Sequence, residues 1–342
     1  MRAAVIHAPF DLRIEDLETP RPGPGEVLVS VGAAGICAGD MYIYQGKNPY
    51  ALYPAVAGHE VAGIVVDLGP GTAGFARGDR VAVEPFIGCG TCYPCRIGKP
   101  NCCAKLVILG VHRPGGYAEY IAAPARNVHR IPPGLSLIEA SFAEPVAIGV
   151  QACRRGAVGA EYVLVLGCGP IGLALIEVAR ARGARVVAAD VLPGRLETAR
   201  RLGAETLVAG DDLERSVLEQ TSGEGAPVVM EATGNPKAME ATVNLVASGG
   251  RIVIIGLVKK GTLVGFPGLD FTRKEMTIVG SRASASCFPE ALELLAGGKI
   301  TYPRVATEFS LWDAPSVFSR IAKDPGSVHK GVLVREAAGE RV

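Results

Sequence analysis

The sequence predicts two domains, a mainly antiparallel β-domain followed by an α/β domain with a parallel sheet. The chain has 342 residues, which is too long for one ordinary hydrophobic core. Up to about residue 148, short β-branched runs are separated by Gly and Pro, as in irregular antiparallel sheets. From Glu161 onward, apolar strands alternate with helical patterns, which is typical of a parallel sheet covered on both faces.

In the first domain, strands are expected at 27–31, 61–66 and 80–83, where β-branched residues cluster between Gly- and Pro-containing turns. The terminal run 329–334 is expected to return to this domain as a further strand. We therefore assign residues 1–148 and about 285–342 to the first domain, and residues 149–284 to the second.

In the second domain, the periodicity predicts strands of four to six residues, most of them followed by a helix. The expected strands are 162–166, 184–189, 206–209, 227–230, 251–255 and 276–279, and the expected helices are 171–182, 194–202, 211–220, 237–246 and, beyond the last strand, 289–295.

A glycine-rich turn, Gly167-Cys168-Gly169-Pro170-Ile171-Gly172, joins the first of these strands to the first helix. The GxGxxG pattern is weak alone, since the chain has 44 glycines, but here it follows a strand and opens a helix. Gly167 permits the tight turn, Gly169 lets the backbone approach a pyrophosphate, and Gly172 allows close helix packing. The positive end of the helix attracts the pyrophosphate, so the turn predicts a dinucleotide site.

Asp190 ends the next predicted strand, where a carboxylate binds the ribose hydroxyls and repels a 2′-phosphate. This favours NAD over NADP. Arg195 either stacks on adenine or binds the phosphate of NADP, which keeps NADP as the alternative coenzyme. A glycine turn in a nucleotide-free α/β fold is the competing interpretation.

Five of the nine cysteines lie between residues 89 and 103. Cys89, Cys92 and Cys95, with Cys103 or Cys102 as a fourth ligand, can enclose one tetrahedral Zn²⁺ without an open position. Such a site stabilises a loop and performs no chemistry. A redox CxxC pair or unrelated free thiols are the alternatives.

A second possible ligand set combines Cys37, His59, Glu60 and Glu144. Three protein ligands and a water make an open, catalytic zinc site. Taken singly, these residues have simpler interpretations as a buried thiol, a core histidine or a helix-capping acid.

Composition excludes several classes of protein. A chain with 49% hydrophobic and 20% charged residues is globular, and its net charge of +1, with no basic tail, argues against nucleic acid and anionic membranes as partners. The N-terminus lacks a signal-peptide pattern, and the longest apolar stretch, 171–179, contains Glu177. We therefore expect a cytoplasmic protein.

Taken together, these motifs resemble the zinc-containing medium-chain dehydrogenase/reductase family over essentially the full length. The resemblance implies a mainly β GroES-like catalytic domain and an α/β Rossmann coenzyme domain. It is carried, in the expected order, by Gly35-Ile36-Cys37 with Asp40, Gly58-His59-Glu60-Val61-Ala62-Gly63, Gly78-Asp79-Arg80-Val81, the 89–103 cysteines, Glu144-Pro145, the glycine turn and Asp190.

The segments around Glu144-Pro145 and 152–156 are similar to the polyol (sorbitol-type) branch. That branch implies that Cys37, His59 and Glu60 hold zinc with a water, and that Glu144 binds this water or the metal. Glu60 and Glu144 are thus the two alternative candidates for the third protein ligand of this zinc. Asp40 would be a structural partner of a zinc ligand.

Further site residues also follow from the resemblance. It implies that Cys103 is the fourth ligand of the four-cysteine site. The residues expected to contact the coenzyme, besides the glycine turn, Asp190 and Arg195, are Thr233, Gly256, Leu257, Ser281 and Arg282.

The expected activity is zinc-dependent hydride transfer between NAD and a secondary alcohol of a polyol or sugar acid (a hexonate 5-dehydrogenase-like reaction), in a homodimer or homotetramer. An L-threonine 3-dehydrogenase-like enzyme, a zinc-free reductase and a non-catalytic NAD-binding protein are the alternatives.

One departure from the family pattern concerns the residues that pass on the alcohol proton. Family members usually carry Ser or Thr two residues after the zinc cysteine and His three residues further, where this chain has Gly39 and Tyr42. Asp40, Tyr42, Glu144 or solvent must then take the alcohol proton.

Overall fold

A computed structural model describes residues 1–335, which divide into two compact units. The first unit contains residues 1–144, 284–297 and the segment from Pro303 onward, and the second contains residues 145–283 and 298–302. The division expected from the sequence lies at residues 148/149 and 284/285. Residues 336–342, which the expected C-terminal return includes, lie outside the described residues.

The main sheet of the first unit has the strand order β16-β17-β3-β4-β5-β9, and β8 also pairs with β3. Its pairs are antiparallel except β16 with β17. The elements are β1 (Arg2–Ala8), β2 (Asp11–Asp16), β3 (Glu26–Gly35), α1 (Ala38–Tyr44), β4 (Glu60–Leu68), β5 (Arg80–Val83), β6 (Phe86–Ile87), α2 (Tyr93–Arg96), η1 (Pro100–Cys102), β7 (Val107–Ile108), β8 (Tyr120–Pro124), η2 (Ala125–Asn127), β9 (Val128–Arg130), α3 (Leu137–Ser141), α10 (Phe288–Ala296), η3 (Tyr302–Val305), β16 (Thr307–Ser310), η4 (Leu311–Asp313), α11 (Ala314–Lys323) and β17 (Gly331–Val334).

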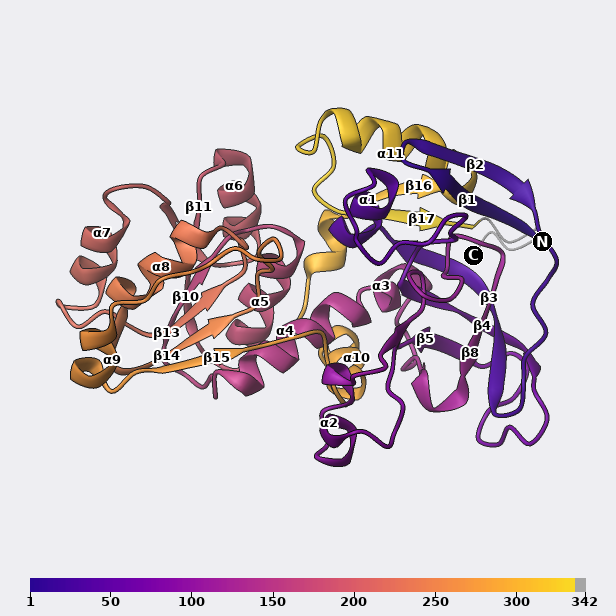
Figure 1. The fold of residues 1–342 in the computed structure, drawn as a ribbon, viewed down its shortest axis with the longest axis horizontal. Helices are drawn as coiled ribbons and strands as arrows, with labels where there is room; N and C mark the ends of the chain where they lie inside the picture. Colours follow the sequence, from indigo (N-terminus) through magenta and orange to yellow (C-terminus); the bar gives the residue numbers. More distant parts are fainter. Residues whose placement is uncertain (336–342) are drawn as a thin grey trace. The chain divides into compact units, whose positions relative to one another are not determined.

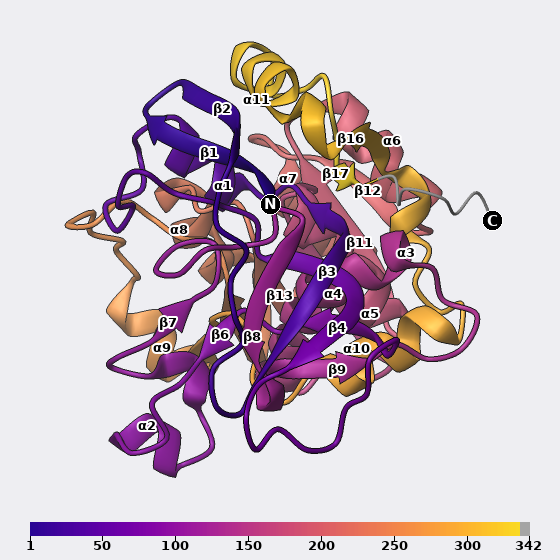
Figure 2. The same cartoon turned by 90° about the vertical axis from the view of Figure 1, so that its right-hand side faces the viewer.

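The C-terminal segment returns to the N-terminal sheet, as the β-branched run 329–334 predicts. Strand β17 pairs with β3 in the register Leu333 to Ala34, and the yellow β17 lies beside the indigo β3 in Figure 1. Helix α11 packs on β2. Figure 2 shows β8, β3 and β4 side by side.

Strands β3 and β4 form the centre of the first unit because their apolar side chains are buried on the sheet. Val27, Val29 and Val31 of β3 share one core with Val61 and Val65 of β4. Burial of each such side chain contributes about 1.5–3 kcal/mol. This pair of strands therefore fixes the positions of the residues that follow β3 and precede β4.

The second unit is built on a six-stranded parallel sheet of order β12-β11-β10-β13-β14-β15. Leu164 and Leu166 of its central strand pack with Val217 and Val243, so the two helices that carry these valines cover one face. Its elements are α4 (Ala143–Arg155, which begins in the first unit), β10 (Tyr162–Leu166), α5 (Pro170–Ala181), β11 (Arg185–Asp190), α6 (Pro193–Arg201), β12 (Glu205–Val208), α7 (Leu213–Gln220), β13 (Ala226–Glu231), α8 (Pro236–Leu245), β14 (Val246–Ile254), α9 (Gly268–Lys274) and β15 (Thr277–Gly280).

All six predicted strands of this sheet are present, although β14 begins at Val246, within the predicted helix and well before the predicted strand. The sequence analysis did not anticipate helices α1, α3, α4, α9 and α11. Three of these have five to seven residues, which is too short for a helical period to stand out. Within residues 1–335, every helix is too short or too polar to cross a lipid bilayer.

Candidate metal centres and coenzyme site

The first candidate metal centre lies where β3 ends and β4 begins. Gly35 pairs with Glu60 in the sheet, so Cys37, just after β3, is brought to His59, just before β4. The ligand atoms of Cys37, His59 and Glu60 all lie within 4.8 Å of one another. A Cβ atom at Gly35 would be 1.9 Å from Oε2 of Glu60, so only glycine lets the carboxylate lie against this strand.

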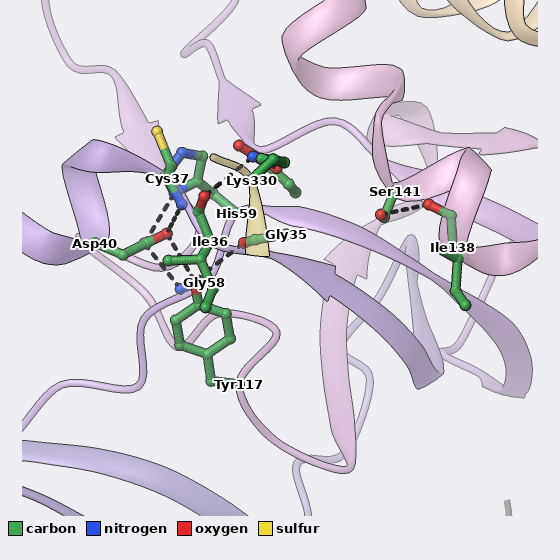
Figure 3. A network of polar contacts seen from close by, with 11 residues as sticks. Gly35, Ile36, Cys37, Asp40, Gly58, His59, Tyr117, Ile138, Ser141 and Lys330 are labelled. Carbon is green, nitrogen blue, oxygen red and sulfur yellow. Dashed lines mark hydrogen bonds and ion pairs between the residues drawn. The ribbon is translucent and has the colours of Figure 1, made fainter. Parts of the chain in front are cut away.

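Asp40 connects the parts of this centre (Figure 3). It is fully buried, and its Oδ1 accepts from the Gly58 N–H and from Nδ1 of His59, both at 3.2 Å. Its Oδ2 accepts from the Cys37 N–H at 2.9 Å and from the Tyr117 hydroxyl at 2.8 Å. Because Nδ1 of His59 is held by a carboxylate, its Nε2 remains for a metal ion. Asp40 is thus a hydrogen-bond partner of His59, one of the two residues that the sequence analysis predicts most firmly as zinc ligands.

The electrostatics of this pair fit the same arrangement. Burial opposes the charge on Asp40, but the neighbouring His59 and the hydrogen bonds outweigh burial and lower the pKa of the carboxyl. Burial would also lower the pKa of His59, yet Asp40 and Cys37 raise it well above its ordinary value. Asp40 and Cys37 thus give His59 a negative environment, which would also favour a bound dication.

Glu144 is buried in the first turn of α4. Burial, with a further contribution from Glu60, raises the pKa of the Glu144 carboxyl to about 7. Among the described residues, Glu144 does not belong to the group of ligand atoms within 4.8 Å, whereas Glu60 does. Geometry therefore brings Glu60 closer to Cys37 and His59 than Glu144.

Residue 39, where family members usually carry a hydroxyl, adjoins the same centre. A Cβ atom at Gly39 would lie 3.6 Å from Cε1 of His59 and 3.9 Å from Sγ of Cys37, which is ordinary van der Waals contact. A serine would therefore fit beside both side chains. Tyr42 is half exposed on α1.

The second candidate metal centre lies around α2 and η1. The sulfurs of Cys89, Cys92, Cys95 and Cys103 lie within 4.8 Å of one another, with Cys92 at 3.4 Å from Cys95 and 3.7 Å from Cys103. Cys102 is exposed and, within residues 1–335, belongs to neither ligand group.

These four thiols suit a cation. The N–H of Thr91 lowers the pKa of Cys89 to about 5, whereas burial and the neighbouring sulfur of Cys92 raise that of Cys95 to about 12. Four thiolates this close would repel one another, and a bound zinc ion would remove that repulsion.

The predicted coenzyme residues share one edge of the parallel sheet. Gly167 follows β10, Asp190 ends β11, Thr233 follows β13, Gly256-Leu257 follow β14, and Ser281-Arg282 follow β15. These are all carboxyl ends of parallel strands. The strand order reverses between β10 and β13, and the crevice at such a reversal is where α/β sheets bind ligands.

The glycine turn has the geometry that a dinucleotide requires. Gly167 has φ of 94°, and a Cβ atom at Gly172 would lie 1.8 Å from the carbonyl oxygen of Gly167. Gly169 caps the N-terminus of α5 without a side-chain hydrogen bond and faces open space. Because Gly169 has no capping side chain and Pro170 has no N–H, the first-turn N–H groups of Ile171 and Gly172 are the ones that can receive a pyrophosphate.

Asp190 lies directly beside this turn. Its Oδ2 accepts from the Cys168 N–H at 2.8 Å, and its Oδ1 accepts from the Leu192 N–H at 2.9 Å. Nη1 of Arg195 lies 3.6 Å from Oδ2 of Asp190. The arginine therefore contacts the carboxylate that the sequence analysis assigned to the ribose.

Comparison with known proteins identifies one known domain in each half of the chain. Residues 23–133 match the alcohol dehydrogenase GroES-like domain, and residues 170–297 match the zinc-binding dehydrogenase domain. L-galactonate-5-dehydrogenase of Escherichia coli K12 is 40% identical over 90% of this chain and 91% of its own length. The chain belongs to the zinc-binding alcohol dehydrogenase family.

Other relatives of this dehydrogenase differ in their substrates. L-threonine 3-dehydrogenase of Pyrococcus horikoshii is 35% identical over 87% of this chain and 88% of its own length. The crystal structure of RspB from Escherichia coli CFT073 with NADH, described as a short chain alcohol dehydrogenase, has a TM-score of 0.91. It is 34% identical and covers 98% of this chain and 99% of that one. The predicted fold class, a Rossmann domain with a GroES-like domain, is confirmed.

The sequence analysis missed two residues of the polar network around the first candidate metal centre. Tyr117 directly follows a segment rich in glycine, and its hydroxyl contacts Asp40. Lys330 precedes β17, and its ammonium contacts Glu60. A lysine at the start of a strand is usually exposed, so the sequence carried no signal for its burial.

Proposed function

We propose that the dehydrogenase transfers a hydride between NAD and the carbon of a secondary alcohol in a polyol or sugar acid. The observation that carries this proposal is the grouping of Cys37, His59 and a carboxylate into an open ligand set. The sugar-acid class is supported by the 40% identity to the L-galactonate enzyme. L-threonine is the second candidate substrate, supported by the 35% identity to the threonine enzyme.

Each residue of the first centre has a role in this proposal. Cys37 and His59, with Glu60 or Glu144, would hold a zinc ion, whose chemistry is to lower the pKa of an alcohol hydroxyl as a Lewis acid. Asp40 fixes the tautomer and orientation of His59. Because four donors already occupy Asp40, the alcohol proton is left to Tyr42, Glu144 or solvent.

The second unit would bind the coenzyme. The glycine turn and the N-terminus of α5 would hold the pyrophosphate, and Asp190 would bind the ribose and exclude a 2′-phosphate. Thr233, Gly256-Leu257 and Ser281-Arg282 would contact the rest of the molecule. The four cysteines, with Cys103 as the fourth, would hold a second zinc that stabilises the 89–103 loop.

A screen of NAD reduction over polyols, hexonates and L-threonine tests this proposal. Zinc-loaded protein should turn over at least one of them, and Cys37→Ala should lose nearly all of that activity while keeping NADH binding. Full activity in Cys37→Ala would refute metal chemistry at this centre. NADH binding without turnover of any alcohol would favour a non-catalytic NAD-binding protein.

A further inference from the structure

Tyr117 is a fully buried tyrosine whose hydroxyl is directed at the network around the first candidate metal centre (Figure 3). Its backbone is fixed on two sides, since its N–H donates to the carbonyl of Ala57 at 3.0 Å and its carbonyl accepts from the N–H of Ala4 at 2.7 Å. Its ring packs edge-to-face on Phe318 of α11, with the ring centroids 5.7 Å apart. A Cβ atom at Gly58 would lie 2.6 Å from this ring, so glycine lets the ring approach the backbone there.

The Tyr117 hydroxyl has two acceptors, and its single proton cannot serve both fully. Its oxygen lies 2.8 Å from Oδ2 of Asp40 and 3.0 Å from the carbonyl oxygen of Gly35. The bond to Asp40 is the stronger one, because a charged acceptor makes a hydrogen bond roughly twice as strong. A phenylalanine would fill the same space without burying a hydroxyl, so packing alone does not explain this tyrosine.

Each oxygen of Asp40 accepts two hydrogen bonds, and the two pairs differ in length. Oδ1 faces the Gly58 N–H and Nδ1 of His59, both at 3.2 Å, whereas the two donors of Oδ2 lie at 2.9 and 2.8 Å. The shorter pair therefore holds the carboxylate more firmly than the pair that includes His59. Of these four donors, all within residues 1–335, two are backbone N–H groups and two belong to the side chains of His59 and Tyr117.

The loss of the hydroxyl would affect the direction in which Asp40 faces. The torsion that turns an aspartate carboxylate has no sharply preferred value, so hydrogen bonds must fix it. Without the Tyr117 hydroxyl, Oδ2 would keep only the N–H of Cys37 as a donor. A ligating histidine depends on its carboxylate partner for tautomer and ring orientation. A less firmly held Asp40 would therefore orient His59 less well.

We propose that Tyr117 is a positioning residue for the candidate ligand His59, acting through the carboxylate of Asp40. The hydroxyl fixes the rotation of the carboxylate, and the carboxylate orients the imidazole. This inference rests on the proposed function only in requiring a metal at this centre, and metal binding tests it without turnover.

The experiment measures zinc binding to Tyr117→Phe, which keeps the ring and removes only the hydroxyl. Competition with a chelator gives the zinc affinity, and Cys37→Ala supplies the contribution of the four-cysteine site for subtraction. The affinity of the first centre should fall by about three- to tenfold, which is less than the loss expected for a direct partner of a ligating histidine. In NMR spectra of protein with isotope-labelled histidine, the Nδ1 signal of His59 should shift, because its hydrogen bond to Asp40 changes.

The Asp40→Asn background separates this route from a general loss of packing. In that background, Tyr117→Phe should change the zinc affinity by less than about twofold, since the carboxylate through which the hydroxyl acts is gone. Tyr53→Phe is the matched control, because the Tyr53 hydroxyl is also partly buried but donates to the backbone carbonyl of Ile43. Its zinc affinity should stay within about twofold of the wild type.

Three results would overturn the inference. The first is a zinc affinity of Tyr117→Phe within about twofold of the wild type. The second is an unchanged Nδ1 signal of His59 in that variant. The third is the same loss of affinity in the Asp40→Asn background, which would mean that the hydroxyl acts through packing or Gly35. Zinc retained by the four cysteines shows that each variant is folded. Loss of turnover with the predicted metal binding intact would count against the proposed function only.

Discussion

Asp40→Asn removes one charge from the centre of the hydrogen-bond network while keeping the size of the side chain. The Asp40 carboxylate accepts from four donors at 2.8–3.2 Å and is fully buried. An amide turns one of its two acceptor atoms into a donor, which would face two of these four groups. Breaking a buried charged contact costs about 3–5 kcal/mol of unfolding free energy.

The same substitution should weaken zinc binding by about 10–100-fold, because a ligating histidine loses the partner that orients it. Urea unfolding and zinc competition with a chelator measure the two effects. Asp67→Asn is the control, since Asp67 pairs with Arg77 on the surface and its loss should stay within about 0.5 kcal/mol. Asp40→Asn with stability within about 1 kcal/mol of the wild type, or with unchanged zinc affinity, would refute this account of Asp40.

Three further predictions concern other parts of the chain. Cys103→Ser should lower the zinc content by about one ion per chain whereas Cys102→Ser should not, because only Cys103 lies with the other three sulfurs; equal zinc contents by elemental analysis would contradict this. Asp190→Asn should reduce the preference for NAD over NADP, as a ratio of kcat/KM, by at least about tenfold, and an unchanged ratio would remove Asp190 from coenzyme selection. Burial raises the pKa of Glu177 above its unfolded value of 4.5, so its contribution is fully present below pH 4.5 and is lost as the pH rises through the folded pKa. Urea unfolding should therefore show less loss of stability from pH 4 to 7 in Glu177→Gln, and an identical loss would argue against this assignment.

Much of this description follows from short stretches of sequence. The parallel sheet was predictable because each buried strand is an apolar run, and its helices follow at a fixed period. The glycine turn was predictable because the backbone conformation at Gly167 disfavours any side chain and the close approach at Gly172 leaves no room for one. The four-cysteine set was predictable because the spacing within one loop already limits where the sulfurs can lie.

The surroundings of the first candidate metal centre depended on contacts between distant residues. Tyr117 reaches Asp40 across 77 positions in sequence, and Lys330 reaches Glu60 across 270. Their positions follow from the pairing of β3 with β4 and of β17 with β3, which local patterns do not specify. Sequence thus determined which side chains are the candidates for binding metal and nucleotide. Tertiary structure decided which carboxylate is held by a cation, because charges interact through space and not along the chain.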